Sequence, residues 1–199
     1  MELEGRAAIV TGAGTGVGAE TARRLAALGC DVLVNNAGTT KFVAHADLEG
    51  LDGEDWDKIL GVNLKGSFFC SRAARDALEA GDGGEIVMTS SVAGLAATGS
   101  SIAYCASKAG VNSLVVSLAR ALAPKIRVNA VAPGFIDGAW LAEGFGDAYE
   151  AIKNAVVQKT PLGRVCTPPE VAQAIVGLIA GPDLITGHVL PIDGGALIA

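Results

Sequence analysis

Short apolar runs rich in Val and Ile alternate along the chain with longer amphipathic stretches. Runs such as Ala8-Ile9-Val10 and Ile86-Val87-Met88 are apolar at every position, as is typical of strands in a parallel sheet that is covered on both faces. Stretches with apolar residues three and four positions apart predict helices. The predicted strands are 7–11, 31–35, 85–90, 127–132 and 188–192, and the predicted helices are 17–28, 55–80, 104–123 and 169–178.

The alternation of strands and helices predicts the α/β class, with a doubly wound parallel sheet. A chain of 199 residues, 50% of them hydrophobic, can bury one core, so we expect a single domain over 1–199. The segment 134–160 is less regular, with Trp140, Phe145 and Tyr149 among glycines and acids. It is either a lid or substrate wall, or an ordinary surface excursion.

The charge balance argues against a nucleic-acid partner. The formal net charge is −6, and the 15 Lys and Arg residues are scattered. The chain begins Met1-Glu2-Leu3-Glu4 with no basic, apolar leader, and no apolar run looks long enough to cross a membrane. We therefore expect a cytoplasmic protein that does not bind a membrane.

The cysteines and histidines predict neither a metal site nor a disulfide framework. No two cysteines have the CxxC spacing, and there are only two histidines. We interpret each cysteine as a small buried apolar residue. The cysteines are Cys30, Cys70, Cys105 and Cys166, and the histidines are His45 and His188.

Tyr104 and Lys108 lie four residues apart, and Ser91 precedes Tyr104 by 13 residues. In a helix, a spacing of four places both side chains on one face. A free tyrosine ionises near pH ~10, and a nearby ammonium group favours the phenolate. The three residues therefore predict a proton-transfer site in which Lys108 lowers the pKa of Tyr104.

A glycine-rich turn, Thr11 to Gly18, directly follows a predicted strand and opens a predicted helix. Glycines let the backbone approach a pyrophosphate, and the free amides at the start of the helix stabilise its charge. The alternative is a merely flexible turn.

Three further features follow strands or interrupt a helix. Taken alone, Asn35-Asn36-Ala37-Gly38 is a turn, and Asn63 is a solvated or kink-forming residue in a helical run. The segment Ala132 to Ile136 follows a strand, where a ligand-facing loop is expected in an α/β sheet.

Together these residues resemble the short-chain dehydrogenase/reductase family, and in particular its 3-oxoacyl-acyl-carrier-protein reductase-like members. The resemblance depends on features that occur in the family's order. They are TGxxxGxG at Thr11 to Gly18, NNAG at Asn35 to Gly38, Asn63, Ser91, YxxxK at Tyr104 and Lys108, PG at Pro133 and Gly134, and DGG at Asp193 to Gly195.

The resemblance implies a Rossmann-like fold and an oxidoreductase that uses NAD or NADP. It implies that Tyr104 is the acid/base, that Lys108 lowers its pKa and holds the nicotinamide ribose, and that Ser91 positions the substrate oxygen. It also implies that Asn63 anchors a water molecule in a proton relay. The implied cofactor contacts are Gly12, Thr15, Gly16, Val17 and Gly18 near the pyrophosphate, Asn36, Ala37 and Gly38 on the adenosine side, and Pro133, Gly134 and Ile136 near the nicotinamide, with Tyr104 and Lys108.

The implied reaction is hydride transfer between the nicotinamide and a carbonyl or alcohol, in either direction. Gly138 departs from the family, which usually has a threonine after the Pro-Gly turn to contact the carboxamide. We therefore expect a looser nicotinamide orientation.

The interval between Gly18 and Asn35 is only 17 positions. Family members place two additional strands and two helices there, and these hold the adenine, so the sheet is shortened between Cys30 and Asp31. The acid expected after the last glycine to bind the ribose is missing, because Asn36 to Thr40 occupy that place. The sequence therefore does not distinguish NAD from NADP.

The short interval also constrains topology. With one helix between the first two strands, a right-handed crossover places strand 31–35 on the wrong side of the first strand unless the helix changes face. Left-handed crossovers occur in about 2% of cases.

Three hypotheses follow: an active dehydrogenase/reductase, a catalytically silent remnant that only binds or oligomerises, and a truncated sequence of an ordinary enzyme. A Cα separation between Cys30 and Asp31 near ~3.8 Å, the span of an intact trans peptide, counts against the third.

Helix 104–123 has apolar or small residues on more than one side, which is compatible with a homodimer or homotetramer and equally with burial inside one subunit. These residues are Ala103, Ala106, Ala109, Gly110, Leu114, Val115, Leu118 and Leu122. The substrate is expected to be a small carbonyl or alcohol compound, and Trp140, Leu141 and Phe145 suggest an apolar wall beside it.

Overall fold

The computed structural model describes residues 7–26, 31–80 and 83–199. Five strands form one parallel sheet in the order β1-β2-β3-β4-β5. All five predicted strands are present, with ends shifted by no more than one or two residues. They are β1 Ala8–Val10, β2 Val32–Asn35, β3 Gly84–Thr89, β4 Ile126–Pro133 and β5 Val189–Ile192.

The four predicted helices are also present, although the prediction for 55–80 is divided among α2, the π-helix η1 and α3. Residues 27 and 28 of the first predicted helix lie outside the described residues. The helices are α1 Gly16–Ala26, α2 Gly53–Leu60, η1 Gly61–Gly66, α3 Ser67–Glu79, α4 Ala93–Ala96, α5 Ile102–Leu122, α6 Ala139–Phe145, η2 Gly146–Ala148, α7 Tyr149–Lys159, α8 Pro168–Ala180 and η3 Ala196–Ile198.

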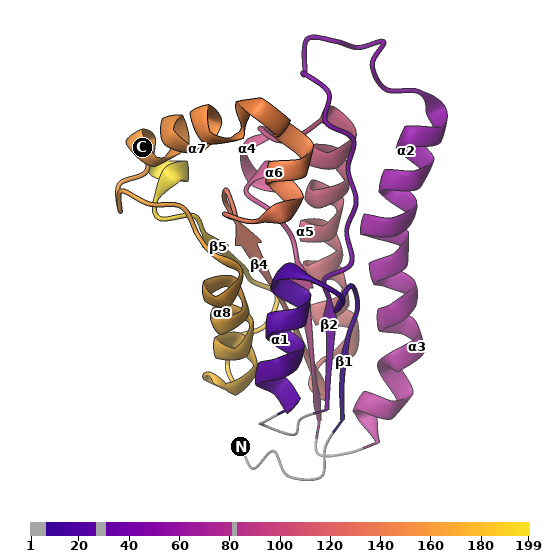
Figure 1. Cartoon of the computed structure of the whole chain (residues 1–199). Helices are drawn as coiled ribbons and strands as arrows, with labels where there is room; N and C mark the ends of the chain where they lie inside the picture. Colours follow the sequence, from indigo (N-terminus) through magenta and orange to yellow (C-terminus); the bar gives the residue numbers. More distant parts are fainter. Residues whose placement is uncertain (1–6, 27–30, 81–82) are drawn as a thin grey trace.

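The expectation of an irregular segment over 134–160 is wrong, because it contains α6, η2 and α7. Gly138 precedes α6, and Gly146 follows it with a positive φ of 52°. These glycines break the apolar periodicity into pieces too short to recognise as helices in the sequence. The segment folds back over the carboxyl end of the sheet (Figure 1).

Helices cover both faces of the sheet. On one face, α1 and α8 lie side by side and pack on Val34, Val87 and Val131. On the other face, α3 and α5 pack on Ile86 and Met88. Because successive strand residues point to opposite faces, the fully apolar strands predicted from the sequence supply both cores.

All four strand connections step in the same direction across the sheet, from β1 to β5. The helices α1 and α8 lie on one face and α3 and α5 on the other, so the two pairs of connections have opposite hands. At least two of the four therefore depart from the right-handed preference of about 98%. The predicted conflict between the short α1 connection and the usual handedness is thus present in the fold.

Strand β1 is the outer strand of the sheet and is poorly covered. Ala8 is exposed and Ile9 is 60% exposed. By contrast, every residue of β2 is buried. In a longer doubly wound sheet, further strands would flank β1, so its exposure reflects the short interval before β2.

Helix α5 is long and apolar enough to cross a membrane by length and composition, which corrects the expectation that no run reaches that length. Half of its most apolar 18-residue window is buried inside the structure. Val111 and Val115 pack against the sheet, so α5 is a core helix here. Burial explains the apolar residues on the side of α5 that faces the sheet, whereas Leu114, Leu118 and Leu122 remain only half-buried.

Candidate active site

The loops that follow the carboxyl ends of the strands meet at one edge of the sheet. Hydrogen bonds connect the loops after β1, β2 and β3: Thr11 Oγ1 accepts from the Asn36 amide at 3.0 Å, and Thr89 Oγ1 donates to Asn36 Oδ1 at 3.2 Å. The amide of Gly134, after β4, donates to the carbonyl of Ile192 on β5 at 3.0 Å. Most of the predicted site residues lie at this edge, as expected for an open parallel sheet.

Ser91 lies between β3 and α4. Its Oγ accepts a hydrogen bond from the Ala93 amide at 3.2 Å and donates to the Pro133 carbonyl at 3.5 Å. Helix α4 packs tightly against α5 at Gly94, where a Cβ would lie only 2.6 Å from the carbonyl carbon of Lys108. Gly94 therefore allows the close approach that brings Ser91 toward the helix of Tyr104 and Lys108.

Tyr104 lies in the first turn of α5 and is buried. The hydroxyl of Ser101, the residue before the helix, accepts a hydrogen bond from the Tyr104 amide at 3.3 Å and so fixes the start of α5. Burial raises the pKa of the Tyr104 phenol to about 12, while the Ser91 side chain acts in the opposite direction. At neutral pH the phenol therefore holds its proton.

Lys108 is also buried, and its Nζ donates a hydrogen bond to the Thr89 carbonyl at 2.7 Å. Burial lowers the pKa of Lys108 to about 8, because little water remains to solvate the ammonium group. The predicted juxtaposition is present, since Nζ lies 5.6 Å from the centre of the Tyr104 ring.

The expectation that Lys108 lowers the pKa of Tyr104 is not met in this structure. The pKa of Tyr104 is raised, and the opposing influence comes from Ser91. The reason is geometric: the ammonium group lies over the ring and bonds to the β3 backbone. A spacing of four residues places two side chains on one face but does not place Nζ beside the phenol oxygen.

Asn63 is buried in the π-helix η1, so the interpretation as a solvated residue is wrong. Its Oδ1 accepts from the Thr39 amide at 2.8 Å, and its Nδ2 donates to the Thr39 carbonyl at 3.0 Å and to Ser107 Oγ at 2.9 Å. Its carbonyl accepts from Ser67 Oγ at 2.8 Å. Single π-helical turns often occur at functional sites, and this one fixes Asn63 against the loop after β2.

Ser107 is a residue that the sequence reasoning missed. It is fully buried, and its hydroxyl accepts from Asn63 Nδ2 and donates to the Tyr104 carbonyl at 2.7 Å. Asn112, one turn further along α5, accepts from Ser90 Oγ at 2.5 Å and donates to the Gly94 carbonyl at 3.0 Å. The available signal was the presence of polar residues on an otherwise apolar helix.

The glycine-rich loop packs directly on the loop after β2. A Cβ on Gly12 would lie 2.9 Å from the Cα of Ala37, and Gly12 has a positive φ of 66°. The hydroxyl of Thr11 accepts hydrogen bonds from the amides of Asn36 and Ala37, each at 3.0 Å. This part of the predicted cofactor site is therefore assembled by contacts within the chain.

The loop fits a pyrophosphate. Gly16 begins α1, and the first intrahelical bond there runs from the Ala19 amide to the Thr15 carbonyl at 3.2 Å. The amides at the start of a helix have no partner within it and can bind an anion. A Cβ on Gly16 would meet no atom within 4 Å, so there is room beside these amides. Val17 and Gly18, the other predicted contacts in this loop, lie in the same first turn.

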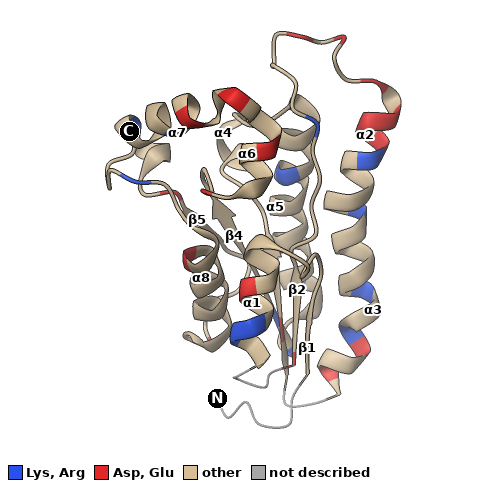
Figure 2. Ribbon diagram, viewed as in Figure 1, with Lys and Arg blue, Asp and Glu red and all other residues tan. Residues whose placement is uncertain are grey.

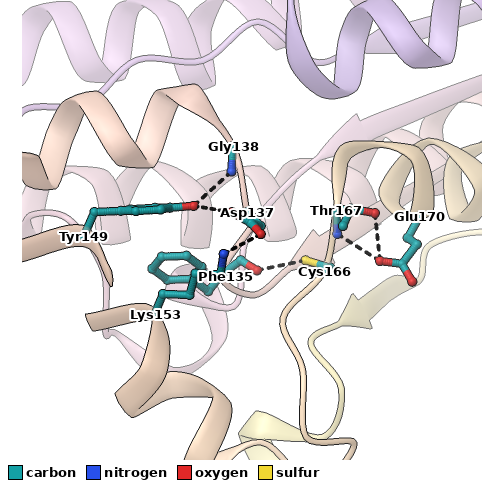
Figure 3. A network of polar contacts seen from close by, with 8 residues as sticks. All are labelled: Phe135, Asp137, Gly138, Tyr149, Lys153, Cys166, Thr167 and Glu170. Atoms are coloured by element: carbon teal, nitrogen blue, oxygen red, sulfur yellow. Dashed lines mark hydrogen bonds and ion pairs between the residues drawn. The ribbon is translucent and has the colours of Figure 1, made fainter. Parts of the chain in front are cut away.

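Pro133 ends β4, and Gly134 and Ile136 follow it in a loop held to the segment before α8. Ile136 forms an isolated parallel bridge with Cys166. The thiol of Cys166 donates to the Phe135 carbonyl at 3.2 Å (Figure 3). The predicted nicotinamide side of the site is thus tied to the strand end.

Asp137 links this loop to α7. Figure 3 shows Tyr149 and Lys153 both pointing toward Asp137. Lys153 Nζ lies 2.6 Å from Asp137 Oδ2, and the Tyr149 hydroxyl donates to Oδ1. The Gly138 amide donates to the Tyr149 hydroxyl at 3.3 Å, so the position where the family usually has a threonine is bonded to α7. The hydrogen bond from the Lys153 ammonium and then that from the Tyr149 hydroxyl lower the pKa of the Asp137 carboxyl.

An aromatic cluster connects α6 to Tyr104. The Trp140 ring centre lies 6.2 Å from that of Tyr104 and 6.2 Å from that of Phe42. The Phe42 ring packs edge-on against Phe145 at 4.9 Å. Trp140 is nevertheless 46% exposed, so the cluster only partly covers its ring. The predicted apolar wall is compatible with this arrangement.

The fold and the site define an α/β protein of the doubly wound type, with a glycine-rich loop and a Ser-Tyr-Lys group at one sheet edge. Residues 26–196 match the family model described as enoyl-(acyl carrier protein) reductase. The chain belongs to the short-chain dehydrogenase/reductase family, so the predicted resemblance and fold are confirmed.

Individual relatives support this assignment. The chain is 41% identical over 170 residues to the 3-oxoacyl-(acyl-carrier-protein) reductase FabG of Thermotoga maritima, covering 84% of this chain and 66% of that protein. The chain thus spans slightly less than two thirds of that relative's length.

Among solved structures, the gluconate 5-dehydrogenase of Burkholderia cenocepacia in complex with NADP and tartrate has a TM-score of 0.89 at 26% identity, with 100% of this chain and 97% of that chain covered. The ligand-free aldohexose dehydrogenase of Thermoplasma acidophilum has a TM-score of 0.89 at 27% identity, with 99% and 96% covered. The fold is thus shared although this chain is shorter.

Proposed function

We propose that the chain is an NAD(P)-dependent oxidoreductase that transfers hydride between a nicotinamide and a carbonyl or alcohol substrate. The observation that carries the proposal is the convergence of Ser91, Tyr104 and Lys108 at the carboxyl edge of the sheet, beside a glycine-rich loop. The nicotinamide, when bound, supplies or accepts the hydride.

In this proposal Ser91 and Tyr104 bind the substrate oxygen, and Tyr104 transfers the proton. The pKa of about 12 keeps the phenol protonated at neutral pH, which suits an acid in the reduction of a carbonyl. Lys108, buried beneath the ring, holds the nicotinamide ribose and adds positive charge. Asn63 holds Thr39 and Ser107 in place and anchors a water molecule in a proton relay.

The cofactor contacts proposed here are the predicted ones. The amides of the loop from Gly12 to Gly18 hold the pyrophosphate, and Asn36 to Gly38 lie on the adenosine side, where Asn36 braces the loop after β1 rather than binding the base. Pro133, Gly134 and Ile136 border the nicotinamide. Cofactor and substrate meet above Tyr104, next to the partly exposed ring of Trp140.

The test is oxidation of NADH or NADPH with a panel of small ketones that includes acetoacetyl-coenzyme A. Replacing Tyr104→Phe should lower kcat by about 10²- to 10⁴-fold, the usual contribution of a general acid. Ser113→Ala, on the exposed side of the same helix, is the matched control and should keep the rate. Equal rates for Tyr104→Phe and the unaltered chain would contradict the proposal.

The alternative is a catalytically silent remnant that only binds or oligomerises. The exposure of β1 favours it, because the described residues 7–26, 31–80 and 83–199 contain no strand on the outer side of β1, where the family holds the adenine. Reduced nicotinamide that binds without turnover of any ketone in the panel would support this alternative. The third hypothesis depends on the Cys30 to Asp31 separation, and Cys30 lies outside the described residues.

The proposed partners are a small carbonyl or alcohol compound and further copies of the chain, as a homodimer or homotetramer in the cytoplasm. Helix α5 keeps some free apolar surface, because Ala106 and Ala109 are exposed and Leu114, Leu118 and Leu122 are only half-buried, although Ala103 and Val115 are fully buried. The neighbouring α3 presents Phe68 and Phe69, which are 38% and 49% exposed. Figure 2 shows Lys and Arg residues interspersed with acids along α2 and α3, which fits no nucleic-acid partner.

A further inference from the structure

The outer side of β1 is where a complete doubly wound sheet reads the adenosine half of a dinucleotide. The strand next to β1 on that side normally ends in the acid or arginine that binds the ribose or its 2′-phosphate. In the part of the chain that the structure describes, β1 is the terminal strand, and its only neighbour is β2. Ile9, at its centre, is 60% exposed.

The space beyond the glycine-rich loop is open among the described residues. A Cβ built on Gly14 or Gly16 meets no atom within 4 Å. By contrast, a Cβ on Gly12 would collide with Ala37 on the β2 side. The loop is thus supported from the β2 side and has no wall near Gly14 and Gly16.

The residues after β2 do not replace the missing wall. The Asn36 side chain is occupied, because its Nδ2 donates to the Thr11 and Gly12 carbonyls and its Oδ1 accepts from Thr89. The amides of Asn36 and Ala37 are bound by the Thr11 hydroxyl. Since these groups hold the loops together, they are not available to select an adenosine.

The other half of the site is complete. Lys108 lies beneath the Tyr104 ring, and Asn63 is held by Thr39 and Ser107. Gly134 is bonded to the end of β5. Contacts for the nicotinamide, its ribose and the pyrophosphate therefore survive the shortening of the sheet.

We infer that the chain recognises its cofactor through the nicotinamide, its ribose and the phosphate, and leaves the adenosine in water. This inference rests on the proposed function. A group that stays in water on binding buries no apolar area and exchanges no hydrogen bonds, so it adds little affinity. Reduced nicotinamide mononucleotide, NMNH, should then bind almost as tightly as NADH, and NADPH should bind like NADH.

The experiment measures equilibrium binding to the full-length chain by quenching of tryptophan fluorescence. Trp140 lies beside Tyr104 and reports occupancy of the nicotinamide half. The Kd values of NMNH, NADH and NADPH should agree within about tenfold, equivalent to about 1.4 kcal/mol. AMP, which carries only the adenosine half of the cofactor, should compete at least tenfold more weakly than nicotinamide mononucleotide.

Two variants locate the binding. Lys108→Met removes a contact to the part shared by all three reduced cofactors, so it should weaken NMNH, NADH and NADPH by the same factor. Lys159→Met, at the exposed end of α7, is the matched control and should leave all three Kd values unchanged. A loss confined to NADH and NADPH would contradict the inference.

The outcomes separate the inference from the proposed function. NADH binding more than tenfold tighter than NMNH, or competition by AMP as strong as that by nicotinamide mononucleotide, would overturn the inference while the oxidoreductase proposal stands. A preference above tenfold between NADH and NADPH would likewise overturn the inference and leave the oxidoreductase proposal standing. Failure of all three reduced cofactors to bind at millimolar concentration would overturn both.

Discussion

Lys108 combines a charged group with a buried position, so its removal should stabilise the fold while it impairs the site. Burial lowers the pKa of Lys108 from 10.5 to about 8. Lys108→Met keeps a long, unbranched side chain and removes the charge. In the protein as it is, the unfolded chain binds this proton more tightly than the folded chain, so the stability contributed at this position rises as the pH rises from about 8 to 10.5.

The magnitude follows from the difference between the two pKa values, 10.5 minus about 8, or about 2.5. At about 1.36 kcal/mol for each pKa unit, keeping Lys108 charged at pH 7 lowers the free energy of unfolding by about 3 kcal/mol. At pH 9.5 the same relation gives a lowering of the free energy of unfolding of only about 1 kcal/mol, because Lys108 in the folded chain has then lost its proton. Lys108→Met also loses the hydrogen bond to the Thr89 carbonyl, which lowers its stability by about 1–3 kcal/mol. This loss is the same at every pH, so it does not alter the pH dependence of the difference between the two chains.

The assay is urea unfolding followed by circular dichroism at several pH values from 7 to 9.5, at one protein concentration. The advantage of Lys108→Met over the unaltered chain should shrink by about 2 kcal/mol across this range, since only the unaltered chain loses the buried charge. Lys159→Met, on the exposed surface, should track the unaltered chain throughout. Parallel curves for Lys108→Met and the unaltered chain would refute the reasoning, because they would mean that Lys108 does not titrate in this range.

Two further predictions concern groups away from the proton-transfer residues. Burial raises the pKa of Glu85 from 4.5 to about 8 although Arg127 lies 2.6 Å away, so the chain should lose stability as the pH rises through this window. Glu85→Gln should flatten that part of the urea stability curve, and an unchanged slope would contradict the assignment. A Cβ on Gly144 would lie 2.1 Å from the Phe42 ring, so Gly144→Ala should lower the free energy of unfolding by about 1–3 kcal/mol. Gly177→Ala, in open space on α8, should instead raise it by about 0.5–1 kcal/mol, and similar effects of both changes in thermal unfolding would argue against the contact with Phe42.

Much of the fold could be read from local pattern. The runs around Val34, Val87 and Val131 are apolar at consecutive positions because the strands are covered on both faces, and that pattern is visible without any tertiary information. Helices α6 and α7 were missed because the glycines around α6 interrupt the periodicity. The division of 55–80 was missed because a π-helical turn at Asn63 has the same apolar pattern as the α-helix on either side.

The candidate site was predicted unevenly for similar reasons. Tyr104 and Lys108 could be paired from a spacing of four because the helix repeat is fixed by backbone geometry. The pKa of Tyr104 could not be predicted from the sequence, since it depends on burial and on where Lys108 Nζ lies relative to the phenol. Ser107 and Gly94 act through contacts between elements distant in sequence, and neither forms a motif.

The sequence by itself determined the class of sheet, the residues of the proposed proton-transfer group and the shortness of the interval before β2, because each can be read from spacing along the chain. Only the tertiary structure decided that β1 is an open edge, that α1 shares a face with α8, and that Lys108 is buried beneath Tyr104. These features depend on how distant segments pack. The packing sets which groups remain in water, and hence both the pKa values and the part of a cofactor that the chain can hold.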